Sequence, residues 1–215
     1  MPVMSDREYR TMTMEVVDVR AAGEDSAGMW VEGYASTFNH RYSMGQKNGY
    51  RLYEQVAPTA FEGTDMTDVI MQYDHEGRVF ARTRNDTLQV TTDEIGLKIR
   101  ARLDGTEIGR QLYEEIRGGY TDRMSFGFSV PKDGEEVTKE KDESGETVLV
   151  RTITHVRKLY DVSAVSLPAN DATEISVRSL VDGLVAQAEE ERLADEERQR
   201  KIKAILAIQI GGQDQ

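Results

Sequence analysis

Short segments rich in β-branched and aromatic residues recur through the middle of this chain, and they constrain its fold more than any other feature. Many of them alternate apolar and polar residues, and Gly, Asp or Asn separates one from the next. A period of two is typical of β-strands, and such separators are typical of turns. The pattern predicts strands over residues 29–37, 68–73, 86–92, 96–103, 123–130, 147–156 and 158–167, with a possible earlier strand over residues 12–21.

One segment within this set has the period of a helix. Over residues 105–119, the apolar side chains of Ile108, Leu112 and Ile116 recur every four residues, and a Gly-Gly pair ends the segment. Residues 131–148 are strongly charged and contain two turn signals, which favours a hairpin or a mobile loop. We therefore expect an α+β fold, a mainly antiparallel β-barrel with surrounding helices.

The last part of the chain has the composition of a helix. Between Glu174 and Ile208 there is no proline, and Gly183 is the only glycine. This segment fits a surface helix that packs on its own domain, and it fits equally a handle that pairs with another chain. We divide the chain into a lead-in over residues 1–28, a folded domain over residues 29–178 and an acidic helical C-terminal extension over residues 179–215.

The composition restricts which partners the chain can bind and in which cellular compartment we expect it. The net charge is −12, which disfavours binding to nucleic-acid phosphates. Cysteine is absent, so disulfides, thiolate metal sites and a cysteine nucleophile are excluded. The longest apolar runs, such as residues 204–208, are too short to span a bilayer, and the first ten residues lack the apolar stretch of a signal peptide. We expect a soluble, non-secreted protein without a membrane partner.

Histidine is the side chain that titrates nearest to neutral pH, and the chain has three. His75 ends an apolar strand and precedes a turn, so the sheet would hold it at the mouth of a cleft. His40 falls in a polar loop, and His155 falls within an alternating strand. His75 is therefore the first candidate for a general base.

Ser125 is the candidate nucleophile. It follows the predicted helix, and Gly127 beside it leaves room for a substrate backbone. A serine hydroxyl needs a neighbouring base to take its proton, which His75 would provide. Asp161 heads an apolar strand and could orient the imidazole, although it could also cap a turn or pair with a nearby cation. His155 would share a face with Asp161 if one strand ran through both.

Other catalytic signatures are missing. The sequence has no G-x-S-x-G elbow, no H-E-x-x-H zinc motif and no phosphate-binding P-loop. Three histidines so far apart in the sequence disfavour a metal site. We expect neither a metal nor an organic cofactor.

Six segments occur in a characteristic order, and together they resemble the prohead, or head maturation, protease family of tailed bacteriophages. The resemblance covers about residues 29–178, and its most specific parts are MSFGF and the downstream DVSAVSLPAN. It implies a fold related to herpesvirus assemblin. It also implies a serine endopeptidase that works inside the procapsid, in the host cytoplasm, on scaffold or on the scaffold-like part of the capsid protein, and often on itself. The segments are residues 31–38, 56–61, 73–83, 93–103, 117–128 and 159–171.

The resemblance also assigns roles by position. The family's histidine and serine fall on His75 and Ser125, and its acidic residue falls on Asp161. The herpesvirus enzymes use a second histidine as third member, which keeps His155 as an alternative. Asp74 stands where family members often have asparagine. The expected partners are the major capsid protein or a scaffold protein, and the chain itself as a homo-oligomer.

Two further expectations concern the site. A substrate should bind as an extended strand added to a sheet edge. The oxyanion of the reaction should meet backbone N–H groups near residues 168–170, or Arg123, although a surface ion pair is the commoner role for such an arginine. The alternative to an enzyme is a catalytically inactive scaffolding or assembly protein on the same fold.

Overall fold

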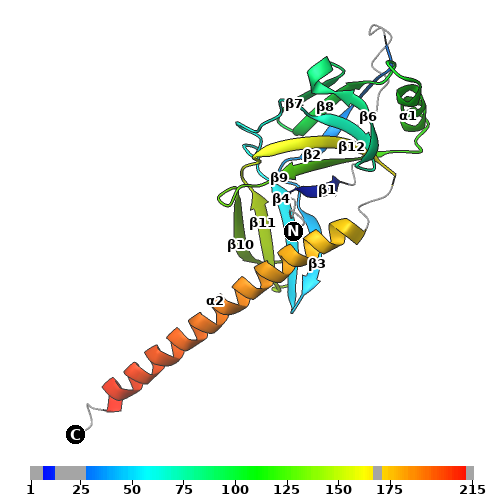
Figure 1. Cartoon of the computed structure of the whole chain (residues 1–215). Helices are drawn as coiled ribbons and strands as arrows, with labels where there is room; N and C mark the ends of the chain where they lie inside the picture. Colours follow the sequence, from blue (N-terminus) through cyan, green and yellow to red (C-terminus); the bar gives the residue numbers. More distant parts are fainter. Residues whose placement is uncertain (1–6, 13–27, 167–170, 212–215) are drawn as a thin grey trace, which may run out of the picture.

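The computed structural model describes residues 7–12, 28–166 and 171–211, which form an α+β fold of three β-sheets and two α-helices (Figure 1). The predicted α+β class is therefore confirmed. Within the described residues, no helix combines the length and the apolar character that a membrane span requires.

The three sheets differ in size. The five-stranded sheet has the order β1 (Glu8–Met12), β9 (Arg123–Ser129), β12 (Lys158–Val165), β5 (Ile70–Tyr73) and β6 (Glu76–Arg82). The four-stranded sheet has the order β10 (Glu135–Lys141), β11 (Thr147–Ile153), β4 (Tyr50–Val56) and β3 (Tyr42–Lys47). The three-stranded sheet has the order β2 (Trp30–Thr37), β8 (Gly96–Arg102) and β7 (Leu88–Thr92), and a 3₁₀ turn, Thr83–Asn85, precedes β7. The pairs β11–β4 and β12–β5 are parallel, and the other described pairs are antiparallel, as predicted for most of the fold.

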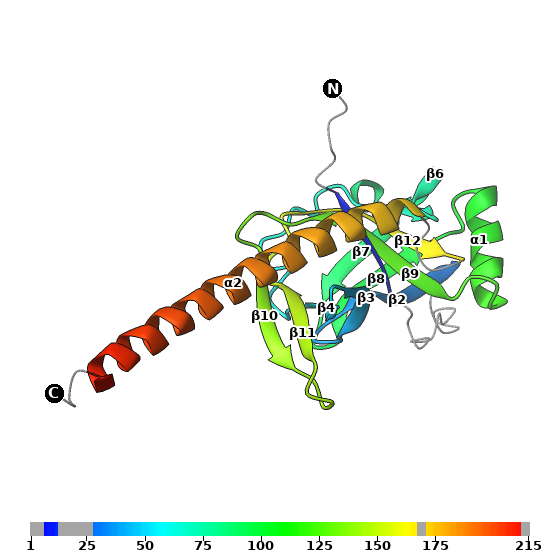
Figure 2. The same ribbon diagram turned by 90° about the horizontal axis from the view of Figure 1, so that it is seen from below.

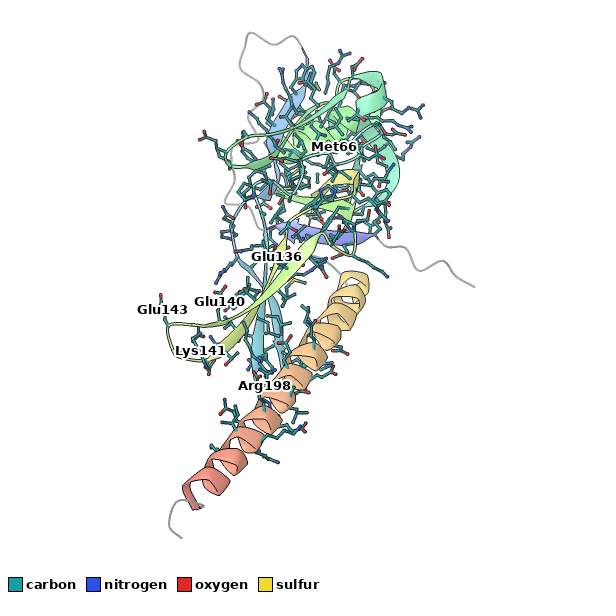
Figure 3. All side chains as sticks on the ribbon, turned by 90° about the vertical axis from the view of Figure 1, so that its left-hand side faces the viewer. Met66, Glu136, Glu140, Lys141, Glu143 and Arg198 are labelled. Carbon is teal, nitrogen blue, oxygen red and sulfur yellow. The ribbon has the colours of Figure 1, made fainter. Side chains whose placement is uncertain are left out.

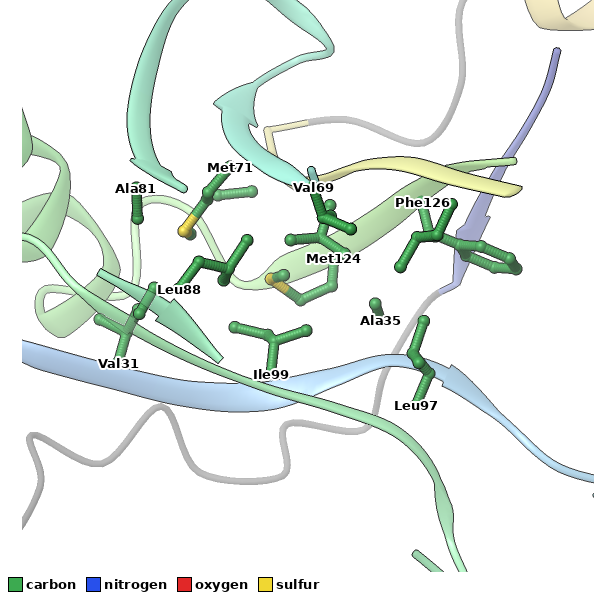
Figure 4. Close-up of a cluster of buried hydrophobic side chains, with 14 of the residues drawn as sticks. Val31, Ala35, Val69, Met71, Ala81, Leu88, Leu97, Ile99, Met124 and Phe126 are labelled. Atoms are coloured by element: carbon green, nitrogen blue, oxygen red, sulfur yellow. The ribbon is translucent and has the colours of Figure 1, made fainter. Parts of the chain in front are cut away.

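The main core lies between the five-stranded and three-stranded sheets (Figure 4). Val31 and Ile99 come from the three-stranded sheet, and Met71 and Met124 come from the five-stranded sheet. All four side chains are buried, because each occupies the inward position of an alternating strand. This packing fixes β9 and β5, the strands that position the site described below.

Helix α1 (Glu107–Arg117) forms where the sequence predicts it. The Thr106 hydroxyl caps its first turn by accepting the Gly109 N–H at 3.0 Å. After the last turn the chain adopts the left-handed conformation at Gly119, with φ of 73°, which ends the helix. The face that packs on the core carries Leu112, Tyr113 and Ile116.

Helix α2 (Asp171–Gly211) lies along the four-stranded sheet with its first half and extends past the body of the molecule with its second half (Figures 1 and 2). Val181, Val185 and Ala188 are buried against apolar side chains of β4 and β11. From Glu190 to Lys203 every side chain is exposed. The boundary that we drew between residues 178 and 179 falls within this helix.

The charged segment over residues 131–148 forms the β10–β11 hairpin, which is one of the two predicted outcomes. Glu140, Lys141 and Glu143 gather near its tip (Figure 3). A second hairpin, β3–β4, occupies the region that we interpreted as a polar loop. Its strand β3 is too polar to show a clear period of two, since most of its side chains reach solvent.

The predicted closed barrel is not formed by the strands that the structure describes. A barrel closes only when its first and last strands pair. In the five-stranded sheet, β1 and β6 are separate edges, and the other two sheets are open as well.

Two strand predictions also change. Of the predicted strand over residues 12–21, only Met12 lies in β1, and residues 13–21 are outside the described part of the chain. The predicted strand over residues 147–156 is too long, because β11 ends at Ile153, and no single strand runs through His155 and Asp161, because β12 begins at Lys158 in a different sheet.

Candidate active site

Strand β9 holds Ser125 at a fully buried position. Its neighbours Phe126 and Phe128 stack on each other in the core, with ring centroids 4.6 Å apart. Because side chains alternate along a strand, Ser125 and Gly127 point to the opposite face of the sheet. The aromatic residues that we noted around Ser125 therefore anchor the strand, and the serine faces the site.

His75 lies in the two-residue turn between β5 and β6. Both Asp74 and His75 have positive φ values, 48° and 59°, as the common tight turns of β-hairpins require. Such a conformation is uncommon for residues other than glycine and carries local strain. The Asp74 carboxylate compensates by accepting hydrogen bonds from the Ser166 N–H at 3.0 Å and hydroxyl at 3.1 Å.

Asp161 comes from β12, the strand beside β9. The pairing of β12 with β9 shifts between Leu159 and Asp161, so Tyr160 is an extra residue in the ladder. A bulge of this kind redirects the side chains that follow it. Here it sets Asp161 opposite Gly127 and Ser163 opposite Ser125, on the face that also receives His75.

The three candidate residues meet in a hydrogen-bonded chain. His75 Nε2 lies 2.6 Å from Ser125 Oγ, and His75 Nδ1 lies 2.6 Å from Asp161 Oδ1. The Ser163 hydroxyl lies 2.9 Å from the same carboxylate oxygen and 3.2 Å from Nδ1. With Nδ1 protonated toward Asp161, Nε2 is left as an acceptor facing the serine.

Burial and a neighbouring cation favour the neutral form of the imidazole. Burial and the nearby Arg7 guanidinium lower the pKa of His75 to about 4, whereas the Asp74 carboxylate acts in the opposite direction. Arg7 forms an ion pair with Asp161, whose side chain is fully buried. His75 is therefore neutral at pH 7 and able to accept a proton.

The other predicted candidates lie elsewhere. Among the described residues, the side chains that hydrogen-bond to His75 are Ser125, Asp161 and Ser163, so the alternative third member His155 is not brought to the imidazole. Arg123 pairs with Asp122 at 3.7 Å, the commoner role that we noted for it. Residues 168–170, where we expected oxyanion donors, are outside the described residues.

Sequence reasoning missed three side chains around the site. Ser163 carried a usable signal, since it lies two residues after Asp161 on one strand and so shares its face. Arg7 and Tyr9 carried none, because they reach the site through the pairing of β1 with β9 across more than a hundred residues. The Tyr9 ring meets the His75 ring edge to face, with centroids 4.5 Å apart.

The site offers acid–base and nucleophilic groups. In the part of the chain that the structure describes, no three His, Asp or Glu side chains gather where they could hold a metal ion. A serine, a histidine and an aspartate joined in this order form the arrangement of the serine hydrolases. The geometry of the site is thus that of the serine hydrolase class, and comparison with known proteins identifies the family within it.

The chain belongs to the caudovirus prohead serine protease family, whose model matches residues 15–184. It is similar to the prohead protease of Enterobacteria phage HK97, with 27% identity over 179 residues, which cover 81% of this chain and 71% of that protein. No solved structure matches. The predicted family is therefore confirmed.

Proposed function

We propose that this chain is a serine endopeptidase of phage head maturation, in which Ser125 is the nucleophile, His75 the general base and Asp161 the residue that orients His75. The hydrogen-bonded chain from Ser125 Oγ through the imidazole to the Asp161 carboxylate carries this proposal. The three residues come from three separate segments, all within the part of the chain that the family model matches.

The reaction follows from this geometry. Ser125 Oγ attacks the carbonyl carbon of the scissile peptide while its proton passes to His75 Nε2. The C–N bond then breaks as the imidazolium gives that proton to the leaving amine, which leaves an acyl-enzyme. Water, deprotonated by His75, attacks the ester and restores the serine hydroxyl. Asp161 keeps Nδ1 protonated throughout and stabilises the imidazolium.

The substrates that we propose are the scaffold protein, or the scaffold segment of the major capsid protein, and the chain itself, inside the procapsid in the host cytoplasm. The single-helix extension beyond the domain supports a role in packaging. Val181, Val185 and Ala188 hold the first half of that helix against the domain, whereas the side chains from Glu190 to Lys203 are exposed and available to another chain. Truncation after Glu191 would test this role while keeping the packed half intact, and unchanged incorporation into proheads would refute it.

Cleavage is tested by co-expression of the chain with its candidate capsid or scaffold protein, read by intact mass. The wild type should produce fragments and the Ser125→Ala variant should not. Ser129→Ala is a matched control, since Ser129 is a fully buried serine on the same strand and the same face. Intact partner with every variant, with the chains still assembling together, would favour the alternative of an inactive scaffolding protein.

A further inference from the structure

Strand β1 is the edge strand of the five-stranded sheet and lies directly beside β9, the strand of Ser125. It pairs with β9 antiparallel, and Thr11 is opposite Ser125 in the register. Ser125 Oγ also lies 2.8 Å from the Arg10 carbonyl oxygen, which competes with His75 Nε2 for the single hydroxyl proton. The serine is fully buried beneath this strand, so an external peptide reaches it only if β1 moves aside.

The same strand also covers the other two members of the site. The Tyr9 ring packs on the His75 ring, and the Arg7 guanidinium pairs with Asp161. Gly127 makes this close approach possible, because a Cβ at that position would lie 2.9 Å from Tyr9 and 2.3 Å from the Asp161 carboxylate. Residues 7–10 therefore contact the site as a bound extended peptide would.

Arg10 turns to the opposite face of β1 and fills a buried pocket. Its side chain is 4% exposed, and two of its nitrogens reach the Glu54 carboxylate at 2.5 and 2.9 Å. The guanidinium also lies over the Phe128 ring, 5.7 Å from the centroid. A bidentate carboxylate beneath a planar aromatic wall is selective for a basic side chain.

The Glu54 carboxylate of this pocket is held by residues outside β1, while Glu8 of β1 pairs with Arg10 and Arg151 at the pocket's side. Glu54 is fully buried, and it is also bound by the Tyr42 hydroxyl and by the Arg151 guanidinium. Burial alone would raise the pKa of Glu54, but Arg10 and Arg151 outweigh it and lower the pKa to about 2. The carboxylate therefore has two partners left, and room for one more cation, when Arg10 withdraws.

We propose that β1 occupies the binding site of the substrate. The Glu54 pocket then binds the side chain of the substrate residue whose carbonyl faces Ser125, and it selects arginine or lysine at that position. This inference rests on the proposed function and names its substrate class: an extended segment with a basic residue immediately before the scissile bond. Ser125 Oγ lies at hydrogen-bond distance from the carbonyl oxygen of Arg10, so β1 occupies the site without being in position for attack. Substrate and β1 compete for one edge.

The competition is measurable without cleavage. The full-length Ser125→Ala chain is titrated with a fluorescein-labelled peptide, Glu-Tyr-Arg-Thr-Met, which has the sequence of β1, and binding is followed by fluorescence anisotropy. Arg10→Ala in the chain weakens β1 as a competitor, so the peptide should bind at least tenfold more tightly, because apparent affinity scales with the fraction of open sites. Arg10→Lys should restore most of the competition, and Arg102→Ala, which removes an exposed arginine from β8, should change nothing.

The pocket is tested from the peptide side on the same parent chain. A peptide with alanine in place of its arginine should bind at least tenfold more weakly, and Glu54→Gln should remove this preference. Equal binding of the arginine and alanine peptides to the parent would overturn the proposal, and this comparison needs no variant that has to fold. An Arg10→Ala chain that keeps its circular dichroism spectrum but gains no affinity would show that β1 is only a structural strand.

These readouts separate the two proposals. Arginine-dependent binding together with an intact partner in the co-expression assay would retain the pocket and reject the enzyme. Partner cleavage after residues that are neither arginine nor lysine would retain the enzyme and reject the pocket.

Discussion

Replacement of Asp161 by asparagine should inactivate this chain by moving one proton on His75. In the wild type, Oδ1 of Asp161 faces His75 Nδ1 at 2.6 Å, and Oδ2 faces the Arg7 guanidinium. Asparagine has only one oxygen, and arginine has only donors. The oxygen will therefore face Arg7 and the amide NH₂ will face His75. Nδ1 must then accept, so the proton moves to Nε2, where it blocks transfer from Ser125.

The expected loss is large. Wrong-tautomer substitution in a serine–histidine–aspartate site lowers kcat by roughly 10⁴-fold, which corresponds to about 5.5 kcal/mol of transition-state stabilisation. Ser163→Ala is the graded comparison, because it removes one hydroxyl 2.9 Å from the same carboxylate and leaves the charge and the tautomer unchanged. We expect roughly a tenfold loss from that variant, the scale of one hydrogen bond to a charged group.

The assay is the initial rate of cleavage of the purified partner protein, with thermal unfolding by circular dichroism as the control for folding. A second variant tests the cause. With β1 in place, Arg7→Ala frees the asparagine to rotate, so NMR of the imidazole nitrogens should find the His75 proton on Nε2 in Asp161→Asn and back on Nδ1 in the double variant Arg7→Ala/Asp161→Asn. An Asp161→Asn protein that is folded and within tenfold of wild-type activity would refute the assignment of Asp161, and the same His75 tautomer in the single and double variants would refute the tautomer argument.

Three further predictions concern the same site. Because His75 must be neutral to act and its pKa is lowered to about 4, kcat/KM should hold down to pH 5.5 and fall only near pH 4; an acid limb near 6.5 would contradict this. Asp74→Asn removes a charge that raises the pKa of His75, so the acid limb should move to lower pH, by less than about one unit, with no change or an upward shift counting against it. Gly127→Ala should destabilise the fold by about 1–3 kcal/mol and abolish cleavage, since the added Cβ would lie 2.3 Å from the Asp161 carboxylate. Gly183→Ala, at a position in α2 with open space around it, should keep activity and stabilise the fold by up to ~1 kcal/mol. Equal denaturant midpoints for the two variants would contradict the packing argument.

Sequence patterns identified most of the elements whose periodicity is enforced by burial. Strands β2, β8, β9 and β12, and helix α1, each send one face into the core, so their apolar residues recur at the period of the element. Strand β4 was also missed, although its residues alternate between buried and partly buried positions. Strands β3 and β6 were missed because most of their side chains are at least partly exposed, which leaves polar residues on both faces. These two strands form because they hydrogen-bond to a neighbouring strand, and a single sequence does not show which segments pair.

The candidate site likewise has features that the sequence indicates and features that only strand pairing creates. His75, Ser125 and Asp161 were assigned through the order of motifs, and spacing alone left them as unconnected residues. The alternative His155 lies outside both strands because the chain leaves one sheet at Ile153 and enters another at Lys158, a break that alternation does not reveal. The bulge at Tyr160, which turns Asp161 to the face of Ser125, is likewise a property of two paired strands.

The two strands beside β9 are held to very different degrees, and this difference decides how a substrate could reach Ser125. Strand β12 pairs on both sides, with β9 and with β5, whereas β1 has five residues and pairs on one side only. Edge strands with few bonds open locally far more often than central strands.

Amide hydrogen exchange measures this directly in the wild-type chain. Amides of β1 should exchange at least a hundredfold faster than those of β12, because opening β1 breaks a single ladder whereas opening β12 breaks two. Arg10→Ala should widen that gap, since it removes the buried contact with Glu54 that anchors the edge strand. If β1 is instead as well protected as β12, the edge beside Ser125 is permanently filled, and a substrate could not add to β9 at this position.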